Sequence, residues 1–429
     1  MYNTRIEWNQ LLSAERLSAI LKGGEENTSG VKRSEFNRDY GRVLYSSAFR
    51  RLQDKTQVFP LGRNDYVRTR MTHSLEVANV GRSLANNLHE IITEREEASQ
   101  APSPEELEDI VATVCLAHDI GNPPFGHSGE DAINTALKDT PYESYVFEGN
   151  AQGFRLLSRT CDPIHGHGLD LTAATLTAFA KYPCTRNSRR THYKKFGLMA
   201  EEADIFHCIA TRCGLRELDE HGDVWARHPL ALLMEAADDI SYLIADVEDA
   251  FFSKIISFEE CMQHLALMAE SIDLPKHLSK TGFHDRANSV HLARALAVGE
   301  SIRRVTDVLR THYDAIMNGS FCGSLMKHTE NRSQYDRVKD FSVSKIYNHE
   351  SVLRIEIAGF NVLKQLLNLF MEWVIAPQSH LGKKVGDILH APHLEEEHER
   401  FLHIIDYVSG MTDTYALHTY NTLFGLSAL

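Results

Sequence analysis

A histidine followed by an aspartate, His118 and Asp119, stands where an apolar run meets a turn rich in glycine and proline. Residues 110–117 are typical of a buried helix, and the glycine and two prolines after the pair are signals that end a helix. An imidazole nitrogen and a carboxylate suit a divalent cation, and a helix end leaves both side chains free to converge on it. Because a lone His-Asp pair is more often a surface or capping pair, this interpretation requires further ligands elsewhere in the chain.

A second histidine, His127, follows in the same turn. If a helix begins at Ser128, His127 lies at its start and Glu130 lies within reach of the imidazole. A histidine oriented by a carboxylate is an arrangement used in general acid–base catalysis. The turn therefore combines a candidate metal pair with a candidate proton-transfer pair.

Two long apolar helices are expected to bring further ligands to this turn. In the first, His73 recurs at helical spacing with apolar residues over several turns, which places its imidazole on the buried face. The second, residues 229–252, is apolar nearly all round in its first half, yet Asp238, Tyr242 and Asp246 follow one another at intervals of one turn. A buried histidine is more often a core residue, and buried carboxylates are often paired with Arg or Lys, so both alternatives stay open.

The composition is that of an ordinary globular protein, with 43% hydrophobic and 24% charged residues among 429. The net charge of -14 argues against a general binder of nucleic acid or of an anionic membrane. Two stretches are nevertheless basic: residues 31–70 hold ten Lys/Arg against four Asp/Glu, and residues 171–200 hold six Lys/Arg and no carboxylate. We interpret them as local anion sites, with a solvated charged face as the alternative.

Cysteine usage and hydropathy indicate the compartment. The cysteines are scattered without a CxxC pair, there is no secretory segment, and no apolar stretch approaches the roughly 20 residues of a membrane span. These features predict a cytoplasmic protein with no membrane partner.

Helical periods dominate the rest of the chain. They are expected at residues 131–138, 149–159, 171–180, 290–310, 352–374 and 398–423, and strand alternation is scarce. The sequence contains no internal repeat and no phosphate loop of the GxxxxGK[ST] type. We therefore predict a nearly all-α fold in which any β structure is confined to a short hairpin.

The candidate ligands on three apolar helices are His73, the His118-Asp119 pair, and one acid of the Asp238-Asp239 doublet. This H...HD...D spacing resembles that of the HD-domain metal-dependent phosphohydrolases. Longer segments resemble the bacterial dGTPase family more closely; they are RRLQDKTQVFPL (50–61), RTRMTHSLEV (68–77), AHDIGNPPFGHSGE (117–130), KYP (181–183), EAADDISY (235–242) and DYVSGMTD (406–413). The likeness covers nearly the whole chain.

The resemblance implies hydrolysis of deoxynucleoside triphosphates to a deoxynucleoside and inorganic triphosphate, and we expect either a preference for dGTP or a broader range of dNTPs. It also implies an all-α fold, an HD-domain helical core with additional C-terminal helices, in a homo-oligomer that is often a hexamer. On this basis we divide the chain into residues 1–60, a basic segment contributing to the nucleotide pocket, residues 61–260, the HD-domain catalytic core, and residues 261–429, a C-terminal helical region with oligomer contacts.

The resemblance also implies roles for individual residues. The metal ligands would be His73, His118, Asp119 and Asp238. We choose Asp238 over Asp239 because the helix of the family places its sugar-contacting tyrosine four residues, and an aspartate eight residues, after the ligand. His127, supported by Glu130, would be the acid/base residue at the α-phosphate. The remaining substrate contacts would be Gln53 and Asp246 at the sugar 3'-hydroxyl, Tyr242 beside the sugar, Lys181 and Lys195 at the phosphates, and Arg70 on the α-phosphate side. The position next to Lys195 is also a lysine, Lys194, and the choice between them stays open.

Two histidines and two carboxylates without cysteine favour one Mn, Mg, Co, Ni or Fe ion over a closed structural zinc site. Two other functions remain in competition. One is a different HD-type phosphohydrolase acting on cyclic nucleotides or alarmones. The other is a low-turnover regulator that senses nucleotides or single-stranded DNA; the basic residues 31–70 leave room for DNA as an effector.

Overall fold

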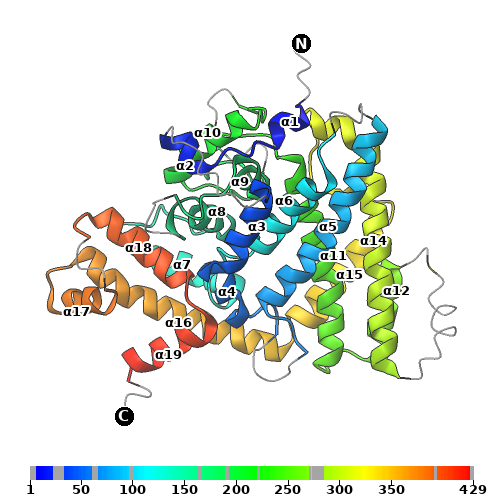
Figure 1. Ribbon diagram of the computed structural model, residues 1–429. Coiled ribbons are helices and arrows are strands. Elements are labelled where there is room, and N and C mark those ends of the chain that lie inside the picture. Colours follow the sequence, from blue (N-terminus) through cyan, green and yellow to red (C-terminus); the bar gives the residue numbers. More distant parts are fainter. Residues whose placement is uncertain are drawn as a thin grey trace.

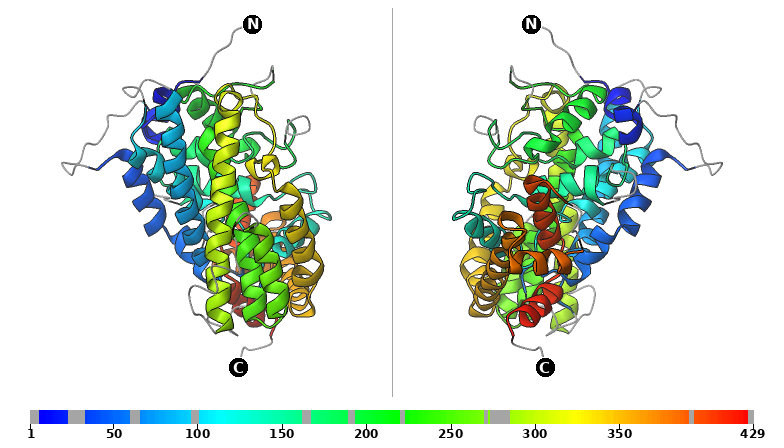
Figure 2. Two further views of the ribbon diagram at one scale, coloured as in Figure 1. Left: turned by 90° about the vertical axis from the view of Figure 1, so that its right-hand side faces the viewer. Right: turned by 90° about the vertical axis from the view of Figure 1, so that its left-hand side faces the viewer.

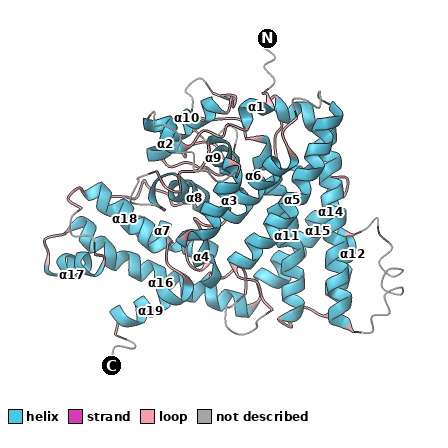
Figure 3. Cartoon of the chain, in the orientation of Figure 1, coloured by secondary structure: helices cyan, strands magenta, loops and turns pink. Residues whose placement is uncertain are grey.

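The computed structural model describes residues 6–22, 33–59, 66–95, 101–161, 167–188, 193–219, 223–269, 272, 285–390 and 394–425. Within these ranges the chain is built of helices joined by loops (Figures 1 and 3), and the only β pairing is a set of isolated bridges, such as Cys184 with Val224. The prediction of an all-α fold is confirmed. No strand and no hairpin forms in the described part of the chain, so the allowance for a short hairpin was not needed there.

The helices of the first half are α1 (Trp8–Leu11), α2 (Leu17–Lys22), α3 (Glu35–Tyr45), α4 (Ser47–Arg51), η1 (Leu52–Asp54), α5 (Arg70–Arg95), α6 (Pro104–Ala117), α7 (Gly126–Leu137), α8 (Gly149–Arg155), η2 (Leu156–Thr160), α9 (Ala173–Phe179), η4 (Ala200–Glu202) and α10 (Ala203–Arg212). Those of the second half are α11 (Pro229–Phe252), α12 (Phe258–Met268), α14 (Arg286–Met317), η5 (Leu325–His328), α15 (Arg332–Phe341), η6 (Ser342–Tyr347), α16 (Glu350–Ile375), α17 (His380–Ile388), α18 (Glu397–Ser409) and α19 (Asp413–Leu423).

Helices α5, α6 and α11 form the centre of the molecule and pack against one another. The apolar first half of α11, from Leu230 to Ala237, is buried throughout, as expected for a helix that is apolar nearly all round. Helices α5 and α6 approach closely at Gly81, where an added Cβ would lie 2.7 Å from the sulfur of Cys115. This close packing brings the start of α5, the end of α6 and the middle of α11 together at one place.

A second buried cluster joins α7 to the C-terminal helices α16, α17, α18 and α19. Helices α12 and α14 belong instead to the first cluster and pack against α11. The two views in Figure 2 show the C-terminal helices, orange to red, on the opposite side of the molecule from α12 and α14. Helix α7 therefore connects the central helices to the C-terminal ones.

Two of the differences between expected and observed helix boundaries have a clear cause in the structure. Helix α7 begins at Gly126 rather than Ser128, because Phe125 takes a left-handed backbone conformation with φ of 61° and the helix starts directly after it. The expected helical stretch 398–423 is two helices, since α18 ends at Ser409 and the Thr412 side chain caps a new helix by accepting a hydrogen bond from the backbone of Tyr415. In the described residues, no helix is long and apolar enough to cross a membrane.

Candidate active site

The His118-Asp119 pair lies directly after α6, with His118 as the C-terminal cap. Its Nδ1 lies 2.7 Å from the carbonyl oxygen of Cys115, and such a contact requires the proton to be on Nδ1. The Nε2 atom is therefore left unprotonated in the neutral ring and faces the carboxylates of Asp119 and Asp238. A histidine whose second nitrogen donates to a backbone carbonyl is in the tautomer that metal ligands adopt.

The predicted ligands meet at one point. His73 Nε2 lies 3.2 Å from Asp238 Oδ1, and His118 Nε2 lies 3.5 Å from the same oxygen and 3.6 Å from Asp119 Oδ1. Ligand atoms of His73, His118 and Asp119 all lie within 4.8 Å of one another. Neighbouring ligands of one ion, each about 2.0–2.2 Å from it, are about 3.0–3.6 Å apart. The cluster thus has the composition and the spacing to hold a divalent cation.

The electrostatics of the cluster also suit a cation. Burial alone would lower the pKa of His118, but Asp119 and Asp238 outweigh it and raise that pKa to about 9. Burial opposes ionisation of Asp238, yet His118, His73 and Lys181 hold its pKa well below the usual range. The pKa of Asp119 is lowered in the same way despite burial, chiefly by Arg70. Two ionised carboxylates in a largely buried place require positive charge between them.

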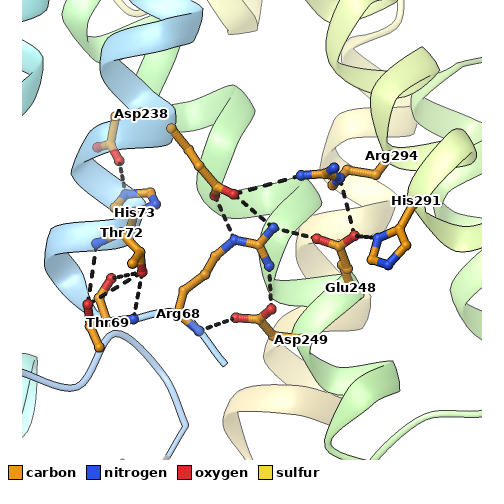
Figure 4. A network of polar contacts seen from close by, with 10 residues as sticks. Arg68, Thr69, Thr72, His73, Asp238, Glu248, Asp249, His291 and Arg294 are labelled. Carbon is orange, nitrogen blue, oxygen red and sulfur yellow. Dashed lines mark hydrogen bonds and ion pairs between the residues drawn. The ribbon is translucent and has the colours of Figure 1, made fainter. Parts of the chain in front are cut away.

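The position of α5, which carries His73, is set by the residues that precede it. Arg68 donates hydrogen bonds to Glu76, Glu248 and Asp249, of which Glu248 and Asp249 lie at the end of α11 (Figure 4). The backbone N–H of Arg68 also donates to Asp249, at 3.1 Å. Two residues later, Arg70 Nη1 donates to Asp119 Oδ2 at 2.7 Å. The segment thus ties the start of α5 both to α11 and to the metal-binding cluster.

His127 lies in the first turn of α7, and its Nδ1 is 3.1 Å from Glu130 Oε2. The other oxygen of Glu130 accepts a hydrogen bond of 2.7 Å from the backbone of Gly149. The His127 side chain is 85% exposed, so the imidazole is oriented by Glu130 and is open to a ligand. The Glu130 hydrogen bond raises the pKa of His127 above its ordinary value. A raised pKa favours a histidine that donates a proton near neutral pH.

A cavity of about 570 Å³ opens beside the cluster, which is within the usual range for small-molecule sites. The predicted site residues that line it are Arg70, His118, Asp119, His127, Lys181, Lys195, Asp238, Tyr242 and Asp246. His73 and Glu130 stand behind this wall as the partners of Asp238 and His127. Residues predicted from five separate segments of the sequence therefore face one space.

Both predicted lysines, Lys181 and Lys195, bring positive charge into the cavity. Lys181 Nζ lies 3.8 Å from both Glu235 and Asp238, and these carboxylates keep its pKa above the ordinary value although burial opposes them. Lys195 Nζ lies 3.4 Å from Glu148. The sequence left open the choice between Lys195 and its neighbour; Lys195 lines the cavity, and Lys194 is not among the lining residues.

Tyr242, Tyr347 and Asp246 also line the cavity. The hydroxyl groups of Tyr242 and Tyr335 lie 3.1 Å apart, and Tyr347 donates a hydrogen bond to Asp246. Burial raises the pKa of Asp246 to about 7, while the Tyr347 hydrogen bond opposes the shift. Burial likewise raises the pKa of Tyr242, so its hydroxyl stays neutral. These three residues therefore contribute neutral or weakly acidic groups to the lining.

Gln53 is the one predicted substrate contact that does not line the cavity. It lies in η1 and is exposed, whereas Thr56 and Gln57 from the same segment do line the cavity. Other lining residues were not predicted. Asn122, which donates to Asp119 Oδ1 at 2.5 Å, stands inside the quoted turn and its amide was a usable signal. Lys339 and Tyr347 line the cavity and come from residues 332–347, where no pattern pointed to a site; Tyr335, from the same residues, contacts Tyr242.

The basic stretch 31–70 is not an open basic surface in the described residues. Arg42 donates to the carbonyl of Leu169, while Arg68 and Arg70 are paired with carboxylates from other helices. Lys55 is buried and donates to two carbonyl groups. Residues 31–32 and 60–65 of that stretch, and residues 189–192 of the second one, lie outside the described ranges. Among the described cations of residues 31–70, only Arg70 lines the cavity.

Two regions of the chain match known protein families. Residues 70–163 match the HD domain, and residues 327–422 match the phosphohydrolase-associated domain. The chain is 39% identical to a deoxyguanosinetriphosphate triphosphohydrolase-like protein of Synechocystis sp., over 98% of this chain and 100% of the relative. It is 36% identical to a protein of the same description from Pseudomonas aeruginosa, over 99% and 100% of the two chains.

A further relative, named deoxyguanosinetriphosphate triphosphohydrolase, comes from Cronobacter sakazakii and is 31% identical over 91% of this chain and 94% of the relative. The similarity extends from the N-terminal helices through the C-terminal ones and includes the segments that build the cavity. This chain is therefore a member of the deoxyguanosinetriphosphate triphosphohydrolase family of HD-domain proteins.

Proposed function

We propose that this protein hydrolyses deoxynucleoside triphosphates, with dGTP preferred, to a deoxynucleoside and inorganic triphosphate. One observation carries the proposal: a single cavity is lined by members of a two-histidine, two-carboxylate cluster, by Lys181 and Lys195, and by Tyr242 and Asp246. A triphosphate needs the cations, and a deoxyribose suits the tyrosine and the weakly acidic carboxyl. The preference for dGTP rests on the names of the relatives.

One divalent ion, Mn, Mg, Co, Ni or Fe, would be held by His73, His118, Asp119 and Asp238. When bound, the ion supplies Lewis-acid polarisation of a phosphoryl oxygen. Arg70 and Asn122 each hydrogen-bond a different oxygen of Asp119 and so hold its carboxylate in orientation. Their role is to keep the ligand set in place before the substrate arrives.

The phosphate groups would be bound by Lys181 and Lys195, with Arg70 on the α-phosphate side. Lys181 stands next to Asp238 and Lys195 next to Glu148, so the two ammonium groups mark a path that begins at the metal cluster. Each lysine is paired with a carboxylate before binding, and a polyanion would then compete for the same N–H donors. The path fits a chain of phosphates rather than a single phosphate group.

His127 would protonate the 5'-oxygen of the departing deoxynucleoside. Glu130 holds the Nδ1 side of the ring, so Nε2 is the nitrogen directed to the substrate. The same carboxylate raises the pKa of His127, which keeps the acid form populated near neutral pH. In this reaction water would attack the α-phosphorus and the Pα–O5' bond would break, so the products are a nucleoside, whose 5'-oxygen takes the proton from His127, and inorganic triphosphate.

Tyr242 and Asp246 would face the sugar, since they follow Asp238 at one and two turns along α11. Asp246 is held by Tyr347 and would accept a hydrogen bond from the 3'-hydroxyl. Gln53, predicted to share this contact, is exposed and outside the cavity lining, so its role stays a prediction.

The deciding experiment is a product assay. The full chain is incubated with each dNTP and Mn²⁺ or Mg²⁺, and nucleoside, monophosphate, diphosphate and inorganic triphosphate are separated. We expect nucleoside and triphosphate in equal amounts, fastest with dGTP. Asp119→Ala should lose both stoichiometric metal and turnover, because the histidines cannot replace the missing charge. Monophosphate as the product would point to a different HD phosphohydrolase, and metal binding without turnover would point to a regulator.

We also propose that the protein is a homo-oligomer, with a hexamer as the expected state, and that nucleotides or single-stranded DNA act as effectors. Native mass spectrometry tests the first point. The second is tested by the rate of dGTP hydrolysis with and without a second dNTP or an oligonucleotide. The pairing of the cations in residues 31–70 gives DNA binding no added support from that segment.

A further inference from the structure

The corner between α18 and α19, residues 409–413, contacts the candidate active site from behind. Ser409 ends α18 and Asp413 begins α19, and both are buried, with 1% and 5% exposure. The segment that joins these helices, red in Figure 1, lies beside α4, where Arg51 donates to the carbonyl of Gly410. We call residues 409–413 the C-terminal corner; none of them lines the cavity within the described residues.

Asp413 is the first connection between this corner and the site. One oxygen of its carboxylate accepts hydrogen bonds from the backbone N–H of Thr56, at 2.9 Å, and from its hydroxyl, at 2.5 Å. The other oxygen accepts from the backbone N–H of Phe125, at 2.9 Å. Thr56 and Phe125 both line the cavity, although they lie far apart in the sequence: Thr56 comes before α5 and Phe125 directly before α7. A single carboxylate of the C-terminal corner thus joins two walls of the cavity.

Phe125 is held on its second side by α16. An added Cβ on Gly359 would lie 2.3 Å from Phe125 Cγ, so the ring fits against the backbone of α16 only because residue 359 is glycine. Phe125 has a left-handed backbone with φ of 61°, a conformation that a residue with a side chain adopts only when its surroundings hold it. It is the residue from which α7 starts, and His127 lies in the first turn. The C-terminal helices therefore set the entry of the helix that carries His127.

Lys55 is the second connection. Its ammonium group, 2% exposed, donates to the carbonyl of Ser409 at 2.9 Å and to the carbonyl of Asn122 at 2.6 Å. The side chain of Asn122 in turn donates to Asp119 Oδ1 at 2.5 Å. Asn122 therefore links Lys55, through its backbone carbonyl, to the candidate metal ligand Asp119, through its side-chain amide.

We propose that Lys55 and Asp413 are positioning residues through which the C-terminal corner sets the geometry of the turn 119–127. This inference rests on the proposed function, because it concerns the same metal and proton-transfer groups. Lys55 acts on Asp119 through Asn122, and Asp413 acts on His127 through Phe125. The two groups touch neither substrate nor metal, and together they hold the ligand and the acid at a fixed separation.

The test uses the full chain and three variants. Asp413→Asn replaces one accepting oxygen by an amide that cannot accept, so either Thr56 or Phe125 loses its partner. Lys55→Met keeps the apolar stem and removes the donor to Ser409 and Asn122. Thr414→Val is the matched control, because Thr414 follows the C-terminal corner directly and contacts the exposed segment at Asp54, at 2.9 Å, rather than the turn.

Two measurements do not depend on turnover: deuterium exchange of peptides from residues 119–127, and Mn²⁺ affinity of chelator-treated protein. We expect Asp413→Asn and Lys55→Met to speed exchange in residues 119–127 and to weaken Mn²⁺ binding by about 10- to 100-fold, the range for changes behind a ligand shell. In both variants, exchange in α14 should stay as in the wild type. Thr414→Val should match the wild type in both measurements.

Wild-type exchange in residues 119–127 together with wild-type Mn²⁺ affinity in Lys55→Met overturns the inference, and so does faster exchange spread evenly over all helices. If Asp413→Asn does not fold, Lys55→Met decides alone, since it removes a buried charge and is the milder change. Failure of the proposed function is distinguishable: without dNTP hydrolysis by the wild type, the exchange and Mn²⁺ results still stand. If hydrolysis is present, kcat should fall more than KM rises in both variants.

Discussion

Replacing Tyr242 tests how the cavity would distinguish deoxyribose from ribose. Tyr242 lies one turn beyond Asp238 on α11, lines the cavity, and has its hydroxyl 3.1 Å from that of Tyr335. In the proposed complex its ring lies against C2' of the sugar. Because the hydroxyl is already engaged with Tyr335, it does not offer a free partner to a ribose 2'-hydroxyl.

The magnitude follows from that arrangement. A 2'-hydroxyl buried without a partner costs about 1–3 kcal/mol, which is a factor of about 5 to 150 in kcat/KM. Tyr242→Ala removes the ring and opens space beside C2', so we expect lower dGTP activity and a dGTP-to-GTP ratio of kcat/KM that falls at least about tenfold, or roughly 1.4 kcal/mol. Tyr242→Phe keeps the ring and removes only the contact with Tyr335, so the ratio should change by less than about threefold.

The assay is kcat/KM for dGTP and for GTP on the wild type and both variants, with thermal unfolding to confirm that each is folded. An unchanged ratio in Tyr242→Ala refutes the steric role and leaves Tyr242 as a core aromatic. An equal fall of the ratio in both variants assigns the discrimination to the hydroxyl pair instead of the ring.

Three further predictions concern other parts of the chain. His127→Ala should retain metal and lose about 10²- to 10⁴-fold in rate. Glu130→Gln should move the alkaline limb of the kcat/KM profile to lower pH, because the carboxylate raises the pKa of His127. An unmoved limb would contradict the pairing of His127 with Glu130. Lys181→Ala and Lys195→Ala should raise the Ki of inorganic triphosphate at least about tenfold, as expected for loss of a charged hydrogen bond, and wild-type inhibition in both would place the phosphate path elsewhere. Burial lowers the pKa of His228 to about 4, so between pH 6.5 and 4 the unfolded chain binds a proton that the native state excludes. The contribution of neutral His228 to the free energy of unfolding should be fully present above pH 6.5. It should fall by roughly 3 kcal/mol as the pH drops to 4. Urea unfolding of wild type and His228→Asn across this range measures it, and equal pH slopes would contradict it.

The helices could be predicted because their periods are local. The apolar spacing around His73 and along residues 229–252 is a property of neighbouring turns, and both segments form helices with those residues buried. Boundaries set by distant contacts could not be predicted. Helix α7 begins at Gly126 because Phe125 is held by Asp413 and packs against Gly359, more than 200 residues away.

The candidate metal ligands could also be predicted from the sequence. A metal ion binds particular residue types, and those types occur here at helix ends or within apolar helices. Distances confirm that His73, His118, Asp119 and Asp238 converge. Their roles remain predictions until metal is measured. Gln53 shows the limit of this reasoning, since a matching motif placed it at the sugar and its side chain is exposed.

What the sequence determined by itself was the set of chemical groups and the helices that carry them, since both depend on residues close together in the chain. Only the tertiary structure decided which charges are available. Arg68 and Arg70 lie in the same basic stretch, yet Arg68 forms ion pairs with Glu248 and Asp249 at the end of α11, while Arg70 forms an ion pair with Asp119. Tyr335 is likewise joined to Tyr242 across 93 residues. The partner of a charged group or a hydroxyl is the group that packs against it, and that group is determined by the fold of the whole chain rather than by neighbours in the sequence.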